Sequence, residues 1–159
     1  MCLMGSIDDA TGNAVSLRFW PTECQAGYIY MARQVTAEHG IPMSFYHDGH
    51  TMLVSPKEPT IDDELAGRKP MSQWQAVLAL LGAEPIRALT PQAKGRIERL
   101  WRTLQDRLTK EMRLAGIASI EQANAFLADF IPRFNARCGR EARDPEAAWV
   151  RPESLSRVK

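Results

Sequence analysis

The first part of the chain alternates apolar and polar positions with the period of a β-strand. Residues 2–7 form one apolar-rich run, and residues 14–20, AVSLRFW, form a second in which the two kinds of side chain alternate. Between them lies DDATGN, residues 8–13, which is rich in turn-forming residues. The pattern predicts a β-hairpin that ends at Pro21.

A helical pattern follows. Apolar side chains recur at helical spacing over residues 23–39, with Thr22 in a capping position before them and Gly40 where a C-terminal cap belongs. Residues 42–48 then read as a short strand that ends at Asp48. The order strand, strand, helix, strand predicts an α/β sheet in which the helix is a crossover connection.

The periodic pattern is lost in the middle of the chain. Over residues 49–70, prolines, glycines and mixed charge indicate a mobile connection. We expect a helix over 73–81, capped by Ser72 and stopped by Gly82, and then a short strand over 84–89. These elements continue the α/β order.

The clearest helix covers residues 95–114, where the apolar side chains form one stripe. The stripe consists of Ile97, Leu100, Trp101, Leu104, Leu108 and Met112. A second helix over 120–131 begins with a capping box at Ser119 and Gln122, and we expect it to kink or end at Pro132.

Length and composition are those of an ordinary globular protein. The chain has 159 residues, 45% hydrophobic and 25% charged; we expect one core over residues 1–138 and a charged, extended tail over 139–159. The net charge of +1 means that any attraction to nucleic acid must come from clustered charge. Three scattered cysteines suit a reducing compartment, and no apolar run approaches a membrane span, so we expect a cytoplasmic protein without membrane contact.

Two carboxylates are candidate functional groups. Asp48 ends a strand, where side chains of α/β sheets often face the functional crevice, although Asp-Gly is also common in turns. Glu98 is expected in the first turn of its helix, where the dipole favours an acid, at the edge of the apolar stripe. There it could reach a metal held by a neighbouring strand, although a surface acid paired with arginines is the simpler interpretation of this residue alone.

The same helix is rich in basic residues. Between residues 94 and 113 there are seven lysines and arginines against three acidic residues. Lys94, Arg96, Arg99 and Arg102 surround Glu98 and form a candidate strip for contacts with DNA phosphates. A solvated helix face is the alternative, because lysine and arginine are good helix formers.

Four segments together resemble the DDE transposases of bacterial insertion sequences, in particular the ISNCY-type group. They are IDDATG, YHDGH after HGIP, TPQAKGRIERLWRTLQDRL and ANAFLADFIPRFNAR, and the likeness covers roughly residues 3–150. These enzymes share the retroviral-integrase catalytic core, so the resemblance implies an RNase H-like fold, a mixed sheet flanked by helices. It also implies a triad of two aspartates and one glutamate that binds Mg²⁺ or Mn²⁺ for DNA nicking and strand transfer in transposition.

Carried over residue by residue, Asp48 matches the second aspartate of the triad and Glu98 matches the glutamate, while Lys94 lies in the matching active-site loop. The first aspartate does not transfer, because in the family it lies on an earlier strand, and Asp8 and Asp9 belong to the hairpin turn. The resemblance therefore implies an N-terminally truncated core without the central first strand, which leaves two strand edges open. Two carboxylates hold at best one ion weakly, so we expect the chain alone to be catalytically incomplete.

Two other interpretations stay open. The chain can be a non-catalytic module that binds DNA or a transposase through its basic helix, or a decayed reading frame without function. The partners implied by the resemblance are DNA, both transposon ends and target, and either a full-length transposase or a second copy of this chain.

Overall fold

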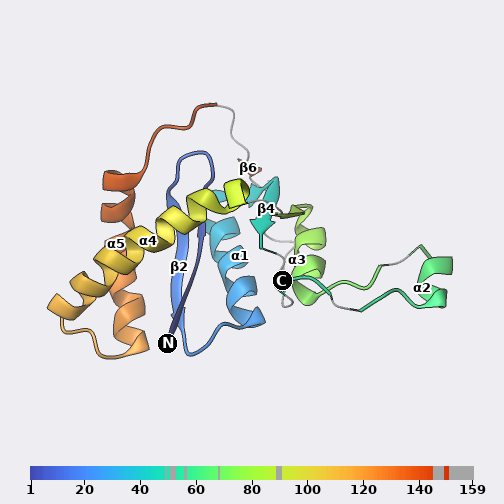
Figure 1. The fold of residues 1–159 in the computed structure, drawn as a ribbon, viewed down its shortest axis with the longest axis horizontal. Helices are drawn as coiled ribbons and strands as arrows, with labels where there is room; N and C mark the ends of the chain where they lie inside the picture. The colour runs from blue at the N-terminus through green and yellow to red at the C-terminus, as the bar shows by residue number, and fades with distance from the viewer. Residues whose placement is uncertain are drawn as a thin grey trace.

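The computed structural model describes residues 1–48, 50, 53–55, 57–67, 69–88, 91–144 and 149–150, without the side chains of residues 91–94. A β-hairpin lies at the centre of the larger part of the molecule, with helices on both of its sides (Figure 1). A smaller group of strands and helices adjoins it. The short helix α2, Ile61–Leu65, lies apart from both groups, at the right of Figure 1.

The hairpin forms as the sequence pattern predicts. β1, Cys2–Ile7, pairs antiparallel with β2, Ala14–Trp20. In the turn, the Asp8 N–H donates to the Asn13 carbonyl at 2.8 Å, and the Gly12 N–H donates to the Asp8 carbonyl at 2.8 Å. Gly12 has a φ of 75°, a left-handed conformation that glycine adopts without strain.

Different helices cover the two faces of the hairpin. α1, Gln25–His39, lies on one face, where the Ser16 hydroxyl donates to Gln34 Oε1 at 2.9 Å. α4, Pro91–Leu114, and α5, Ile120–Cys138, pack on the other face. The core there consists of Ala14, Leu17, Phe19, Leu100, Leu104, Leu108, Met112, Ala123, Leu127, Phe130 and Phe134. The apolar stripe predicted for α4 is thereby confirmed, with Ile97 and Trp101 packed at its margin.

α5 also closes the outer edge of β2. The Asn135 side chain accepts a hydrogen bond from the Ala14 N–H and donates one to the Ala14 carbonyl, both at 2.9 Å. Asn124 makes the same two bonds with Phe19, at 2.8 Å and 3.1 Å. The two asparagines thus satisfy backbone groups that an edge strand otherwise exposes.

A pair of parallel strands organises the smaller part of the molecule. β4, Ser44–His47, pairs with β5, Glu84–Arg87, so the carboxyl ends of the two strands lie side by side. β3, Ile41–Pro42, pairs instead with β6, Trp149–Val150. The strand predicted over 42–48 is therefore two short strands that belong to different pairs.

α3, Gln73–Leu81, packs beside the parallel strands with the caps that the sequence predicts. Ser72 forms a capping box at its start, and Gly82 ends it with a φ of 73°. Trp74 is buried and contacts Phe45 edge-on, with the ring centres 5.4 Å apart. This contact joins α3 to β4 in a second hydrophobic core.

The starts of two helices differ from the prediction. The N-cap of α1 is Cys24 rather than Thr22, and no side-chain hydrogen bond caps the helix. α4 begins at Pro91 rather than at residue 95, because proline suits the first helical position, where an N–H has no partner in any case. Gly95 therefore lies within the helix.

Two further elements extend beyond what the pattern predicts. α5 continues through Pro132 to Cys138, because Pro132 is exposed and the lost hydrogen bond lies on the solvent side while Phe134 packs in the core. The predicted connection over 49–70 contains α2, which starts at a capping box formed by Thr60. Of the predicted tail over 139–159, residues 145–148 and 151–159 lie outside the described residues.

Within the described residues, the strands form three separate two-stranded sheets: β1 with β2, β3 with β6, and β4 with β5. No described strand pairs with the second edge of β1, where the expected RNase H-like sheet would hold its first strand. The mixed α/β character is present, and the RNase H-like fold itself stays a prediction.

Candidate catalytic carboxylates and basic surface

Asp48 directly follows β4, at the carboxyl end of the parallel strand pair. The Ala88 N–H donates to the His47 carbonyl at 2.8 Å, so Asp48 lies beside the residue that follows β5. The Asp48 side chain is exposed and accepts a hydrogen bond from the His50 N–H at 3.0 Å. This bond is typical of an Asx turn, and it leaves the carboxylate with capacity for further ligands.

The charge of Asp48 acts on groups from two elements. Burial, a hydrogen bond to the Glu23 carboxylate, and the negative charges of Glu23 and Asp48 raise the pKa of Tyr28, which lies on α1. Burial lowers the pKa of His47 on β4, and the neighbouring Asp48 opposes this effect. Asp48 is therefore electrostatically close to α1 as well as to its own strand.

Glu98 lies further from the start of α4 than the sequence predicts. Because α4 begins at Pro91, Glu98 is in the second turn, about 10 Å along the helix axis. The prediction that it lies in the first turn is wrong, and the favourable dipole effect is confined to that turn. Its carboxylate is exposed and forms no ion pair with any other side chain that the structure describes. The ion pair between Glu98 and an arginine, which the simpler interpretation requires, is therefore not found among the described side chains.

The two aspartates of the hairpin turn have structural partners, as predicted. The Asp8 carboxylate accepts hydrogen bonds from the Thr11 hydroxyl at 2.6 Å and from the Ala10 N–H at 3.2 Å. Asp9 forms an ion pair with Arg96 at 3.0 Å. Both are turn residues rather than members of a carboxylate cluster.

The donor groups present do not fit a complete metal site. Carboxylates such as Asp48 and Glu98 are ligands that Mg²⁺ and Mn²⁺ prefer. A two-metal site, however, needs bridging carboxylates that hold the ions about 3.5–4 Å apart. Throughout the described ranges, no three His, Cys, Asp or Glu side chains come together closely enough to hold a metal ion.

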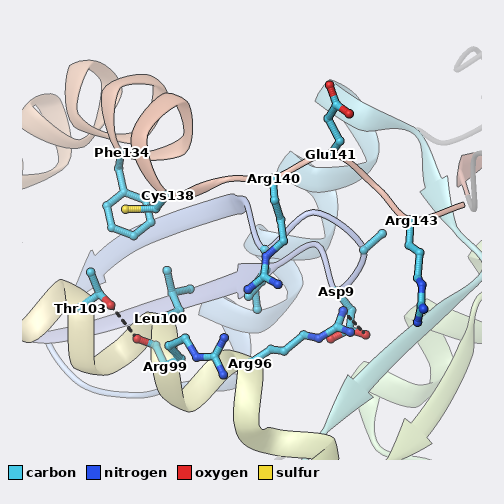
Figure 2. Close-up of a pocket in the computed structure, with 13 residues that line it drawn as sticks. Asp9, Arg96, Arg99, Leu100, Thr103, Phe134, Cys138, Arg140, Glu141 and Arg143 are labelled. Carbon is cyan, nitrogen blue, oxygen red and sulfur yellow. Dashed lines mark hydrogen bonds and ion pairs between the residues drawn. The ribbon is translucent and has the colours of Figure 1, made fainter. Parts of the chain in front are cut away.

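The basic residues predicted as one strip lie on different sides of α4. At 100° per residue, Arg102 is about 40° from Glu98 around the helix, whereas Arg99 is about 100° and Arg96 about 160° away. Arg96 and Arg99 line a cavity on that other side (Figure 2). Lys94 lies in the first turn of α4, where the structure describes the backbone alone.

The cavity has a volume of about 280 Å³ and lies between the hairpin turn, α4 and the segment that follows α5. Four arginines line it: Arg96, Arg99, Arg140 and Arg143 (Figure 2). The sequence pattern does not identify Arg140 and Arg143 as candidate residues, because it assigns residues 139–159 to a tail. The available signal was the basic run RCGREAR, residues 137–143, at the end of α5 and directly after it.

Cys2, Cys24 and Cys138 are free thiols, as their scattered spacing predicts. In the part of the chain that the structure describes, no helix combines the length and the apolar character needed to cross a bilayer.

Comparison with known proteins relates the chain to transposases. It is 40% identical over 133 residues to "Putative transposase y4bF" of Sinorhizobium fredii, a match that covers 84% of this chain and 28% of that protein. It is 34% identical over 141 residues to the transposase for insertion sequence IS1202 of Streptococcus pneumoniae, covering 87% of this chain and 29% of that protein. No family model and no solved structure matches the chain. The chain thus spans less than a third of the length of the two curated transposases to which its sequence is similar.

Proposed function

We propose that the chain is part of the catalytic core of a DDE transposase and acts in DNA transposition. In this proposal Asp48 and Glu98 are two of the carboxylates that bind Mg²⁺ or Mn²⁺. The sequence similarity to two transposases supports the role in transposition. The assignment of the two carboxylates depends on one structural observation, the parallel pairing of β4 with β5.

The parallel pairing supports the assignment because Asp48 and Ala88 follow the two strands at the same end of the pair. The residue after β5, Ala88, is hydrogen bonded to the residue before Asp48. α4 begins three residues later, at Pro91, and Glu98 is about 10 Å along it. Functional groups of α/β folds gather at the carboxyl ends of parallel strands, which is where Asp48 and the start of α4 lie.

The proposed reaction is metal-dependent DNA nicking and strand transfer by the whole transposase. The described residues supply two candidate ligands and no cluster of three. We therefore assign the completing carboxylate to a part of the transposase outside the described residues, and we expect this chain alone to be inactive. Among the basic side chains that the structure describes on α4, Arg102 lies nearest to Glu98 around the helix, at about 40°, and we expect it to contact DNA beside that carboxylate.

The experiment combines a nicking assay with Mn²⁺ binding by electron paramagnetic resonance. We expect the purified chain to bind one Mn²⁺ weakly and not to nick labelled transposon-end DNA. Asp48→Asn and Glu98→Gln should each abolish Mn²⁺ binding, whereas Glu38→Gln, which removes an exposed acid on α1, should not. Equal Mn²⁺ binding in all variants would refute the ligand assignment. Nicking that Glu98→Gln abolishes would show instead that the chain alone is a complete enzyme.

A second function is favoured by the absence of a three-ligand cluster in the described ranges. The chain would then be a non-catalytic module that binds DNA or associates with a full-length transposase. Such a module keeps its DNA affinity and its association with the transposase after Asp48→Asn and Glu98→Gln, and these changes in the full-length protein leave nicking intact. Nicking by the full-length Asp48→Asn and Glu98→Gln variants therefore separates the two functions.

A further inference from the structure

The segment after α5 is held firmly across the hairpin turn. The Arg140 N–H donates to the Thr11 carbonyl at 3.1 Å. A Cβ added at Gly139 would lie 2.0 Å from Asn13 Oδ1, so the crossing is too close for any other residue without a shift. This close contact holds the segment with Arg140 and Arg143 over the cavity beside α4.

Positive charge around this cavity is only partly neutralised. Arg96 is paired with Asp9, whereas Arg99, Arg140 and Arg143 form no ion pair with residues in the described ranges. Like charges around one cavity repel each other, and an anion between them removes that repulsion. The charge distribution therefore favours an anionic ligand.

The side-chain directions agree with an anion site. Figure 2 shows the guanidinium group of Arg140 pointing toward α4, on the side where Arg99 and Arg96 lie. The acidic residue of the same segment, Glu141, points its carboxylate away from them. The lining thus presents guanidinium groups from two separate parts of the chain.

The lining of the cavity favours a phosphate group over a base. The aromatic residue in its lining, Phe134, is only 6% exposed, so it offers no free face for base stacking. Guanidinium groups match the oxygens of a phosphate in a bidentate arrangement.

We propose that this arginine-lined cavity binds a backbone phosphate of DNA through Arg99, Arg140 and Arg143. The inference rests on the proposed function and adds a second DNA contact to it, on the side of α4 away from Glu98. Arg96 contributes less, because Asp9 already neutralises it. The segment after α5 is thereby a DNA-binding element.

DNA affinity as a function of salt tests the proposal, measured by fluorescence anisotropy with a short labelled duplex. Loss of this one phosphate contact in Arg140→Ala/Arg143→Ala should reduce the slope of log Kd against log salt by about 0.9 and raise Kd at least about tenfold at 0.1 M salt. Arg33→Ala/Lys57→Ala removes the same charge from exposed positions on α1 and near α2. This control should leave the slope unchanged.

Thiol alkylation gives a second measurement that does not depend on a variant. Cys138 is exposed and lines the cavity, whereas Cys24 is partly buried and lies before α1. DNA should slow the alkylation of Cys138 by maleimide and leave the rate at Cys24 unchanged, as measured by mass spectrometry.

The outcomes separate this inference from the proposed function. If the chain binds DNA and both double variants bind equally well, or if DNA leaves the alkylation of Cys138 unchanged, the cavity is not a phosphate site while the proposed function stands. If the chain does not bind DNA, the cavity is not a phosphate site for DNA, and the Mn²⁺ experiment decides the proposed function separately. Tighter binding to an RNA duplex of the same length would overturn DNA as the ligand.

Discussion

Replacement of Asn135 by alanine should destabilise the protein by about 2–4 kcal/mol. The Asn135 side chain makes two hydrogen bonds of 2.9 Å with the backbone of Ala14, which is buried. Each bond contributes about 1 kcal/mol, and a buried backbone group left without a partner costs about 1–3 kcal/mol. The small gain in helix propensity from alanine offsets only part of this loss.

The prediction depends on a geometric match between α5 and β2. Asn124 and Asn135 are about 16 Å apart along a helix, at 1.5 Å per residue, and Phe19 and Ala14 are about 16 Å apart along a strand, at 3.3 Å per residue. Successive residues of a strand direct their backbone groups to opposite edges, so residues 14 and 19 would ordinarily face opposite ways. The register shift opposite Ser6 and Ile7 turns both toward α5.

Urea denaturation measures the free energy of unfolding, and amide hydrogen exchange reports the Ala14 N–H. Asn124→Ala should cost a similar amount, and the double variant should show the sum, because sites this far apart are usually additive. Arg137→Ala, an exposed change on the same helix, should stay within about 0.5 kcal/mol of the parent. A cost below about 0.5 kcal/mol for Asn135→Ala, with unchanged exchange at Ala14, would refute the reasoning.

Two glycines and one tyrosine give further predictions. Gly5→Ala should lower the free energy of unfolding by about 1–3 kcal/mol, because the new Cβ would lie 2.9 Å from the Ser16 carbonyl oxygen. Gly95→Ala should raise it by about 1 kcal/mol, because no atom lies within 4 Å of the new Cβ and the position is helical. Urea denaturation compares the two, and a shared sign would contradict this account. Because the pKa of Tyr28 is raised in the folded protein, its hydroxyl stays protonated at pH values where the same group ionises in the unfolded chain. The contribution of this tyrosine to stability is therefore complete below about pH 10 and is lost as the pH rises further. Tyr28→Phe should therefore show a shallower alkaline loss of stability in denaturation curves, and identical pH profiles would exclude this role.

Structural features that depend on residues close together in the chain are predicted correctly from the sequence. The hairpin, the caps of α3 and the apolar stripe of α4 each follow from local periodicity, turn chemistry or capping, and the structure confirms them. Asp48 and Glu98 were identified as candidates from their places at a strand end and on an amphipathic helix. Both side chains are exposed in the structure, and their role as metal ligands stays a prediction that Mn²⁺ binding tests.

Features that depend on contacts between distant segments were decided by the tertiary structure. Pro132 does not end α5, because packing of the following Phe134 stabilises the helix beyond it. The asparagines of α5 gain their role only where β2 presents a matching edge. Arg140 and Arg143 likewise become neighbours of α4 only because Gly139 crosses the hairpin turn. Local periodicity encodes which face of an element is apolar, but which segments meet depends on burial and hydrogen bonding across the whole chain.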